Sequence, residues 1–199
     1  KRKPKKKSPK KKKKAEDYFW YNATDTIEMN ETYLRCTVRG NPQPLKRHRT
    51  SRGFTYNPSA AAQDFFRKAV QDQCDFKPTY DLDEKDNLVP ISHFGSDVAL
   101  KMRVIFYLQR PLSHFVSNRR GNNRLKPDPA WKLSRRVDID NLAKFVLDSL
   151  NEVLYGDDQQ IVVLECTKCY DTQDECLGKT ELQLEVLHNM PQSSIILQE

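Results

Sequence analysis

The chain has 199 residues and a net charge of +7 at neutral pH, and it lacks any apolar run of the roughly 18 residues that a membrane-spanning helix requires. This length suits one domain with a hydrophobic core and excludes neither an enzyme nor a binding module. The charge is unevenly distributed. The first fourteen residues hold eleven lysines or arginines and no acid, and removing these eleven charges leaves the other 185 residues at −4.

The positive charge therefore belongs to the N-terminal segment, and residues 1–31 are predicted to form a basic, disordered arm. Such a lysine-rich tract is typical of a nuclear-import signal or a tether to nucleic acid, and a solubilising tail remains the alternative. Five cysteines, an odd number, favour an intracellular, reducing compartment. This predicts the nucleus if the source is eukaryotic, and otherwise the nucleoid or cytoplasm, with no membrane partner.

The elements of the second segment, residues 32–190, follow from hydrophobic periodicity and turn residues. Residues 32–39 alternate as a strand, and a basic, proline-containing loop follows them. A helix is predicted from Asn57 as N-cap to Gln73. The remaining elements, in chain order, are a long loop or insertion at 74–96, a strand at 98–108, a second long basic loop at 109–137, a helix from Asp140 to Leu154, and strands at 161–168 and 181–187.

The order β-α-β-α-β-β predicts an α+β domain, with a small mixed or antiparallel sheet and two main helices. The apolar positions of the second helix recur with a 3.6-residue period, so one of its faces is expected to lie in the core.

Carboxylates bracket this second helix. Asp138 and Asp140 lie at its start, Lys144 follows one turn later, and Asp157 and Asp158 come just after its end. Helix capping explains any one of these aspartates. If the chain turns back after the helix, however, the carboxylates gather, and a divalent cation would relieve their repulsion. Mg²⁺ suits one or two carboxylates completed by water and phosphate oxygens.

The stretch 138–168, DIDNLAKFVLDSLNEVLYGDDQQIVVLECTK, resembles the signature of the RusA family of Holliday-junction resolvases, and the basic GNPQPLKRHR stretch extends the similarity upstream. The resemblance implies a homodimeric, Mg²⁺-dependent endodeoxyribonuclease, with Mn²⁺ as a substitute, that nicks four-way DNA junctions in recombination and repair. It implies Asp138, Asp140 and Asp158 as catalytic metal ligands and Lys144 as the catalytic lysine. It leaves Asp157 as an alternative ligand and Gln160 as a support for that loop.

Two basic loops are predicted to bind the phosphates of branched DNA, although solvated surface charge remains the alternative for each residue. The residues concerned are Lys46, Arg47, Arg49, Arg124, Lys126, Arg135 and Arg136. A stripe on the second helix, formed by Ala143, Leu147, Leu150 and Leu154, is interpreted as a dimer seam, with the core as its alternative.

The competing hypothesis is a non-catalytic DNA-binding protein that relies on the arm and the basic loops. A third, a nucleotide-dependent enzyme with a D-x-D motif, requires phosphate-cradling glycines, and the six glycines of the chain show no such spacing.

Overall fold

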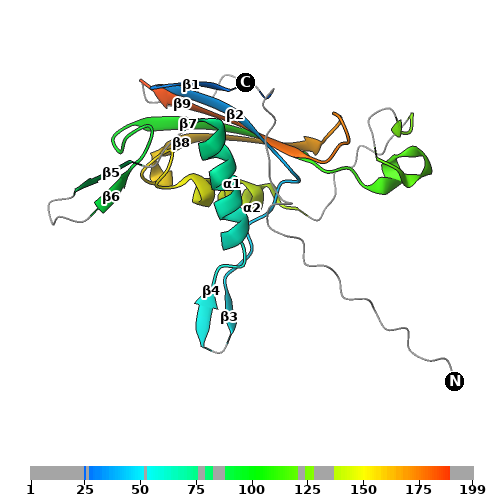
Figure 1. The fold of residues 1–199 in the computed structure, drawn as a ribbon, viewed down its shortest axis with the longest axis horizontal. Coiled ribbons are helices and arrows are strands. Elements are labelled where there is room, and N and C mark those ends of the chain that lie inside the picture. Colours follow the sequence, from blue (N-terminus) through cyan, green and yellow to red (C-terminus); the bar gives the residue numbers. More distant parts are fainter. Residues whose placement is uncertain are drawn as a thin grey trace, which may run out of the picture.

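A mixed, five-stranded sheet forms the centre of the molecule, and both helices pack against one of its faces (Figure 1). The computed structural model describes residues 25, 27–51, 53–75, 79–82, 88–120, 124–127 and 137–188. In spatial order the strands are β1 (Glu28–Asn30), β2 (Tyr33–Arg39), β9 (Lys179–Leu187), β7 (Ala99–Leu108) and β8 (Ile161–Tyr170). β7 and β8 run parallel, and every other neighbouring pair is antiparallel.

The predicted α+β class with two main helices is confirmed. Helix α1 (Ala60–Gln73) begins two residues later than expected because Asn57 forms a turn, in which its side chain accepts a hydrogen bond from the Ser59 amide at 2.8 Å. Helix α2 (Ile139–Leu150) begins one residue before the predicted start and ends four residues early. Glu152 then adopts a positive φ of 61°, which a continuing helix does not permit.

Several short elements lie where the sequence predicted loops or the arm. β1 belongs to the predicted arm, and the rest of that arm up to residue 24 lies outside the described residues. The basic loop contains a hairpin of β3 (Arg49–Ser51) and β4 (Phe54–Tyr56), and the 74–96 segment contains a hairpin of β5 (Thr79–Leu82) and β6 (Leu88–Ile91). The 109–137 segment contains two short 3₁₀ turns, Leu112–His114 and Val116–Asn118.

The core lies between the sheet and the helices. Alternate residues of β2, β7 and β9 point into it, and α2 contributes Leu142, Phe145 and Val146. Phe145 lies edge-on to Phe66 of α1, with ring centroids 5.8 Å apart, which ties the two helices together beneath the sheet. None of the helices in the described ranges is both long and apolar enough to cross a membrane.

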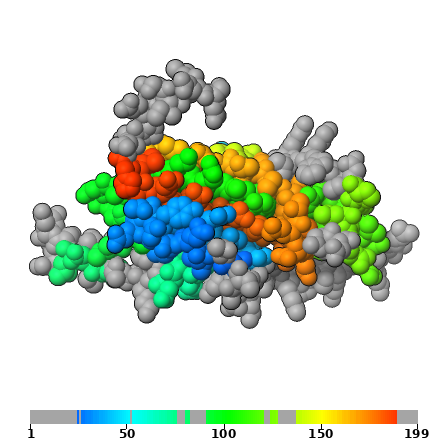
Figure 2. Space-filling view, turned by 90° about the horizontal axis from the view of Figure 1, so that it is seen from above, coloured from blue at the N-terminus to red at the C-terminus, as the bar shows by residue number. Residues whose placement is uncertain are grey.

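The opposite face of the sheet is polar. Glu165 of β8 bonds Lys101 and Arg103 of β7, and Lys179 bonds Glu181 within β9. In Figure 2 this face shows blue β1 and β2, red β9 and green β7 as adjacent bands. The helices therefore leave one face of the sheet open, and the predicted site lies on the other.

The Phe145 ring is the central contact between the helices, so Phe145→Ala is expected to lower the free energy of unfolding by about 3–5 kcal/mol through lost burial and the cavity it leaves. Urea unfolding followed by circular dichroism measures this change. Lys68→Ala, an exposed substitution on α1, serves as the control and is expected to change stability by less than about 0.5 kcal/mol. An equal loss in both variants would contradict this account of the core.

Candidate active site

The start of α2 carries two carboxylates that form no hydrogen bond capping the helix. Asp138 is the N-cap residue, with extended backbone (φ −80°, ψ 138°), yet its side chain makes no capping hydrogen bond and is exposed. Asp140 follows in the first turn, with 60% of its side chain exposed. The capping alternative therefore fails for Asp138, whose carboxylate is free to bind a ligand.

Lys144 lies one turn further along the same side of the helix. Its Nζ is 3.7 Å from Oδ2 of Asp140, and both side chains are 60% exposed, so solvent screens this ion pair and it contributes little to stability. An ammonium group held this loosely beside the Asp140 carboxylate is able to turn toward a phosphate.

Two long-range contacts fix the start of α2. Lys168 of β8 donates from Nζ to the carbonyl of Val137 at 2.7 Å, and the amide of Leu45 donates to the carbonyl of Asn141 at 2.8 Å. The second contact also attaches the predicted basic loop to the helix. These anchoring roles were not predicted, because each joins residues that lie far apart in the sequence.

The last turn of α2 and the turn after the helix carry a second group of carboxylates. Asp148 accepts a hydrogen bond from Nε2 of Gln63 at 3.5 Å. Burial raises the pKa of Asp158, and the nearby carboxylates of Asp157 and Asp148 raise it further. The carboxylate of Asp148, in the last turn of α2, is thus one of the charges that Asp158 faces.

Gln160 holds the Asp157–Asp158 turn in place, as predicted. Its Oε1 accepts from the amides of Gly156 at 2.7 Å and Asp157 at 3.2 Å, while its Nε2 donates to two carbonyls of the segment that leads into β7. The neighbouring Tyr155 is buried and donates from its hydroxyl to the carbonyl of Leu147 at 2.9 Å. The loop after α2 is therefore anchored to the helix and to β7.

Asp148, one of the carboxylates that raise the pKa of Asp158, stands apart from the first turn of α2. Asp140 and Asp148 are eight residues apart on a continuous helix, which corresponds to about 12 Å along its axis. Among the described residues, no three His, Cys, Asp or Glu side chains gather closely enough to hold a metal ion. The predicted set of Asp138, Asp140 and Asp158 as metal ligands therefore stays a prediction.

The basic residues of the first loop lie on the flank of α2. The Lys46 amide donates a hydrogen bond to the buried Ser59 hydroxyl at 3.0 Å, and the Leu45 amide is bonded to α2. These contacts hold Lys46 and Arg47 beside the first turn of α2, and both side chains are exposed. The hairpin that follows carries Arg49 at its base. It projects away from the body of the molecule (Figure 1).

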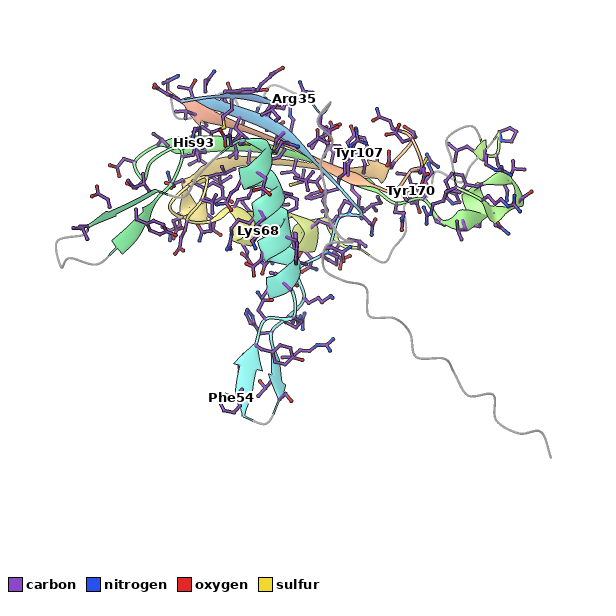
Figure 3. The ribbon with its side chains drawn as sticks, in the orientation of Figure 1. Arg35, Phe54, Lys68, His93, Tyr107 and Tyr170 are labelled. Atoms are coloured by element: carbon purple, nitrogen blue, oxygen red, sulfur yellow. The ribbon has the colours of Figure 1, made fainter. Side chains whose placement is uncertain are left out.

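An exposed aromatic residue at the tip of this hairpin was missed by sequence reasoning. Phe54 is 79% exposed, and Figure 3 shows it at the end of the projection. All six hairpin strand residues are exposed, including Tyr56 at 48%. The signal was present in the sequence, because Gly53 follows Arg52 between two short β-prone runs, as in two-residue hairpin turns.

The second basic loop is described in part. Arg124 and Lys126 are exposed, and Lys126 donates from Nζ to the Ser113 carbonyl at 2.6 Å. Arg135 and Arg136 lie outside the described residues. This loop follows β7, whose last residue Leu108 pairs with Tyr170 of β8, so it starts at the end of the sheet where α2 also begins.

The predicted dimer seam on α2 is largely wrong. Leu150 and Leu154 are fully buried in the core of the single chain, Ala143 is 6% exposed, and Leu147 packs against the core at its edge. The alternative interpretation as core is correct. The 3.6-residue period alone did not separate the stripe from the neighbouring core face.

The start of α2 thus combines exposed carboxylates with a lysine on an α+β fold. The model of the endodeoxyribonuclease RusA family matches residues 37–184, which is most of the chain, and the protein belongs to this family. The chain is also similar to the uncharacterized protein YqaN of Bacillus subtilis (strain 168), with 33% identity over 64 residues. That match covers 32% of this chain and 45% of the relative, so the chain spans less than half the length of that relative.

Neighbouring acids in the turn after α2 are expected to affect stability in opposite directions. Asp157 accepts a hydrogen bond from the Gln159 amide at 2.9 Å within a capping box, so Asp157→Ala is expected to cost about 1 kcal/mol. Asp158 has a raised pKa in the folded state, so its ionised form is disfavoured there, and Asp158→Asn is expected to raise the melting temperature at neutral pH.

The gain for Asp158→Asn should shrink as the pH falls through the raised pKa, because the wild-type carboxyl then becomes protonated and neutral as well. Thermal unfolding of both variants and the wild type at neutral and acidic pH measures this. A loss of stability in Asp158→Asn at neutral pH would contradict the assignment of repulsion at this position.

Proposed function

We propose that this protein is a metal-dependent, structure-specific endonuclease that resolves four-way DNA junctions by paired nicking of phosphodiester bonds. The observation that carries the proposal is the start of α2, where Asp138 and Asp140 are exposed and free of capping bonds, with Lys144 beside them. Membership of the RusA endodeoxyribonuclease family supports the same activity.

The oxygen donors of Asp138 and Asp140 suit Mg²⁺, or Mn²⁺ in its place, because Mg²⁺ is commonly held by one or two carboxylates while water and phosphate oxygens fill its other positions. In the proposal these two residues hold the ion, with Asp158 as a third ligand and Asp157 as the alternative. When bound, the ion supplies a Lewis acid and a more acidic water. Lys144 stabilises the negative charge that develops on the phosphate.

Basic residues would hold the DNA, since the domain without its first fourteen residues is net negative and must attract phosphates locally. In the proposal, Lys46, Arg47 and Arg49 contact one arm of the junction, and Arg124 and Lys126 contact another, together with Arg135 and Arg136. Phe54 would stack on an unpaired base at the branch point, because aromatic side chains stack on every base type.

A homodimer is part of the proposal, because a four-way junction presents two equivalent strands to be cut. We further propose an intracellular, reducing location, consistent with five free cysteines, with the Lys-rich arm directing the protein to the nucleus if the source is eukaryotic. The alternative, a DNA-binding protein without catalysis, explains the basic loops but not the uncapped carboxylates at the start of α2.

Cleavage of a synthetic four-way junction tests the activity. The wild type is expected to introduce paired nicks near the branch point with Mg²⁺ and none with a chelator. Asp138→Asn and Lys144→Ala should each slow cutting by about 100-fold or more, as expected for the loss of a metal ligand or of transition-state stabilisation. Asp72→Asn, which removes an exposed acid of α1, should cut at the wild-type rate.

Binding without cleavage at any Mg²⁺ or Mn²⁺ concentration would favour the non-catalytic alternative. Cutting that persists in Asp138→Asn would place the chemistry elsewhere in the molecule.

The role of the hairpin is tested by Phe54→Ala. Loss of one stacked base is expected to weaken junction binding by about tenfold while linear duplex binding changes little. Fluorescence anisotropy with labelled DNA in a chelating buffer measures both affinities. Tyr80→Ala, at an aromatic that is 59% exposed on the other hairpin, is the matched control and should leave both unchanged. Equal losses on junction and duplex would assign Phe54 a general role in DNA binding.

A further inference from the structure

Gln63 of α1 is a polar side chain that is buried where α1 meets α2, with 6% of its surface exposed. Its amide group forms hydrogen bonds in two directions. Oε1 accepts from Nδ2 of Asn57 at 2.7 Å, and Nε2 donates to Oδ2 of Asp148 in the last turn of α2 at 3.5 Å. Gln63 thus connects the segment that precedes α1 with a carboxylate at the far end of α2.

The backbone fixes the orientation of this amide group. A backbone N–H only donates, so the Asn57 atom that accepts from the Ser59 amide at 2.8 Å is the oxygen Oδ1. Nδ2 of Asn57 therefore faces Gln63, which accepts with Oε1 and directs its donor Nε2 at Asp148. A carboxylate only accepts hydrogen bonds, so every group in this series meets a partner of the opposite kind.

The other end of this series of hydrogen bonds lies at the base of the β3–β4 hairpin. Asn57 directly follows Tyr56, the last residue of β4. On the other side of the hairpin, the Lys46 amide donates to the buried hydroxyl of Ser59 at 3.0 Å. Phe54, which is 79% exposed, lies at the tip (Figure 3). A ligand that moves or holds the hairpin therefore acts first on Asn57 and the start of α1.

The two helices are bonded to each other next to this series. Arg67, one turn after Gln63, donates from Nε to the carbonyl of Ser149 at 3.0 Å. A change at Asn57 is therefore passed on by turning the Gln63 amide rather than by moving α1. The bond from Gln63 to Asp148 is the longest of the series, so it is the bond that such a turn breaks most readily.

Asp148 in turn acts on the loop after α2. Its carboxylate is one of the charges that Asp158 faces. The interaction between charges weakens as their separation grows, so the place of the Asp148 carboxylate sets how much negative charge surrounds Asp158. A cation held by Asp158 gains from this second carboxylate even when Asp148 is not a ligand.

We propose that Asn57 and Gln63 are positioning residues, through which DNA bound at the β3–β4 hairpin holds the Asp148 carboxylate in place and so strengthens metal binding at Asp158. This inference rests on the proposed function, in which the hairpin binds the junction and Asp158 is a metal ligand. It adds a path of named hydrogen bonds from the DNA-binding hairpin to the metal site. The metal would be held most tightly when the hairpin is occupied.

A double-mutant cycle tests this path. Isothermal titration calorimetry measures Mn²⁺ binding to protein saturated with a four-way junction, in a Lys144→Ala background that slows cutting. Phe54→Ala and Gln63→Met are each expected to weaken Mn²⁺ binding by about fivefold, at the lower end of typical coupling between sites. Because both substitutions interrupt one path, the doubly substituted protein should also lose about fivefold, whereas independent effects would multiply to about 25-fold.

Asn57→Asp interrupts the path without changing the hairpin tip. The new side chain still accepts from the Ser59 amide but no longer donates to Gln63, so Mn²⁺ binding is expected to weaken as in Gln63→Met. Gln73→Met is the matched control, because Gln73 is equally buried on α1 but bonds the backbone of Thr37 on β2. It should lower the melting temperature and leave Mn²⁺ binding unchanged. If Gln63→Met does not fold, Asn57→Asp replaces it in the cycle.

Losses that multiply in the doubly substituted protein would overturn the inference, because the hairpin and Gln63 would then act independently. An equal loss of Mn²⁺ binding in Gln73→Met would also overturn it, since the effect would then follow from the stability of α1. In both cases a wild type that still cuts junctions leaves the proposed function intact. A wild type that neither cuts junctions nor binds Mn²⁺ would overturn the proposed function and the inference together.

Discussion

The burial of one face of α2 is the constraint on which the rest of this molecule depends. The helix is continuous from Ile139 to Leu150, and its apolar face, with Leu142, Phe145 and Val146, is buried against the sheet. Burial of this face fixes the rotation of the helix, so its polar side, which carries Asp140 and Lys144, must face outward. The same packing that stabilises the fold therefore displays Asp140 and Lys144 on the surface.

Hydrogen bonds from polar side chains add to the packing of the core in fixing α2 and the turn after it. Lys168 lies near the end of β8, and Gln160 comes just before its start. Each donates to the backbone of a distant segment. Together they hold in place the backbone segments that carry Asp138 and Asp158. Burial, followed by the carboxylates of Asp157 and Asp148, raises the pKa of Asp158, so the fold tolerates a crowded group of acids that a structural role does not require. Such a cost is typical of functional sites, where stability is lost to hold charges in place.

The sequence predicted the elements with strong periodicity well, namely β2, β7, α2, β8 and β9, because the apolar positions that give each pattern form the core. It failed for short elements without burial, such as the β3–β4 hairpin, in which all six strand residues are exposed. Nor did it predict what holds the loop that carries Asp158. Gln160 donates hydrogen bonds to the carbonyls of Gly95 and Val98, more than 60 residues away, and no local pattern encodes these contacts.

Exposure of the carboxylates at the start of α2 follows from the same packing. Asp138 is the N-cap residue without a capping hydrogen bond, and Asp140 and Lys144 lie on the polar side that the buried face turns outward. Lys168 and Leu45 hold the backbone on either side of these residues, so the exposed side chains start from a fixed backbone. Capping does not account for Asp138, and binding of a ligand is the role that its exposure supports.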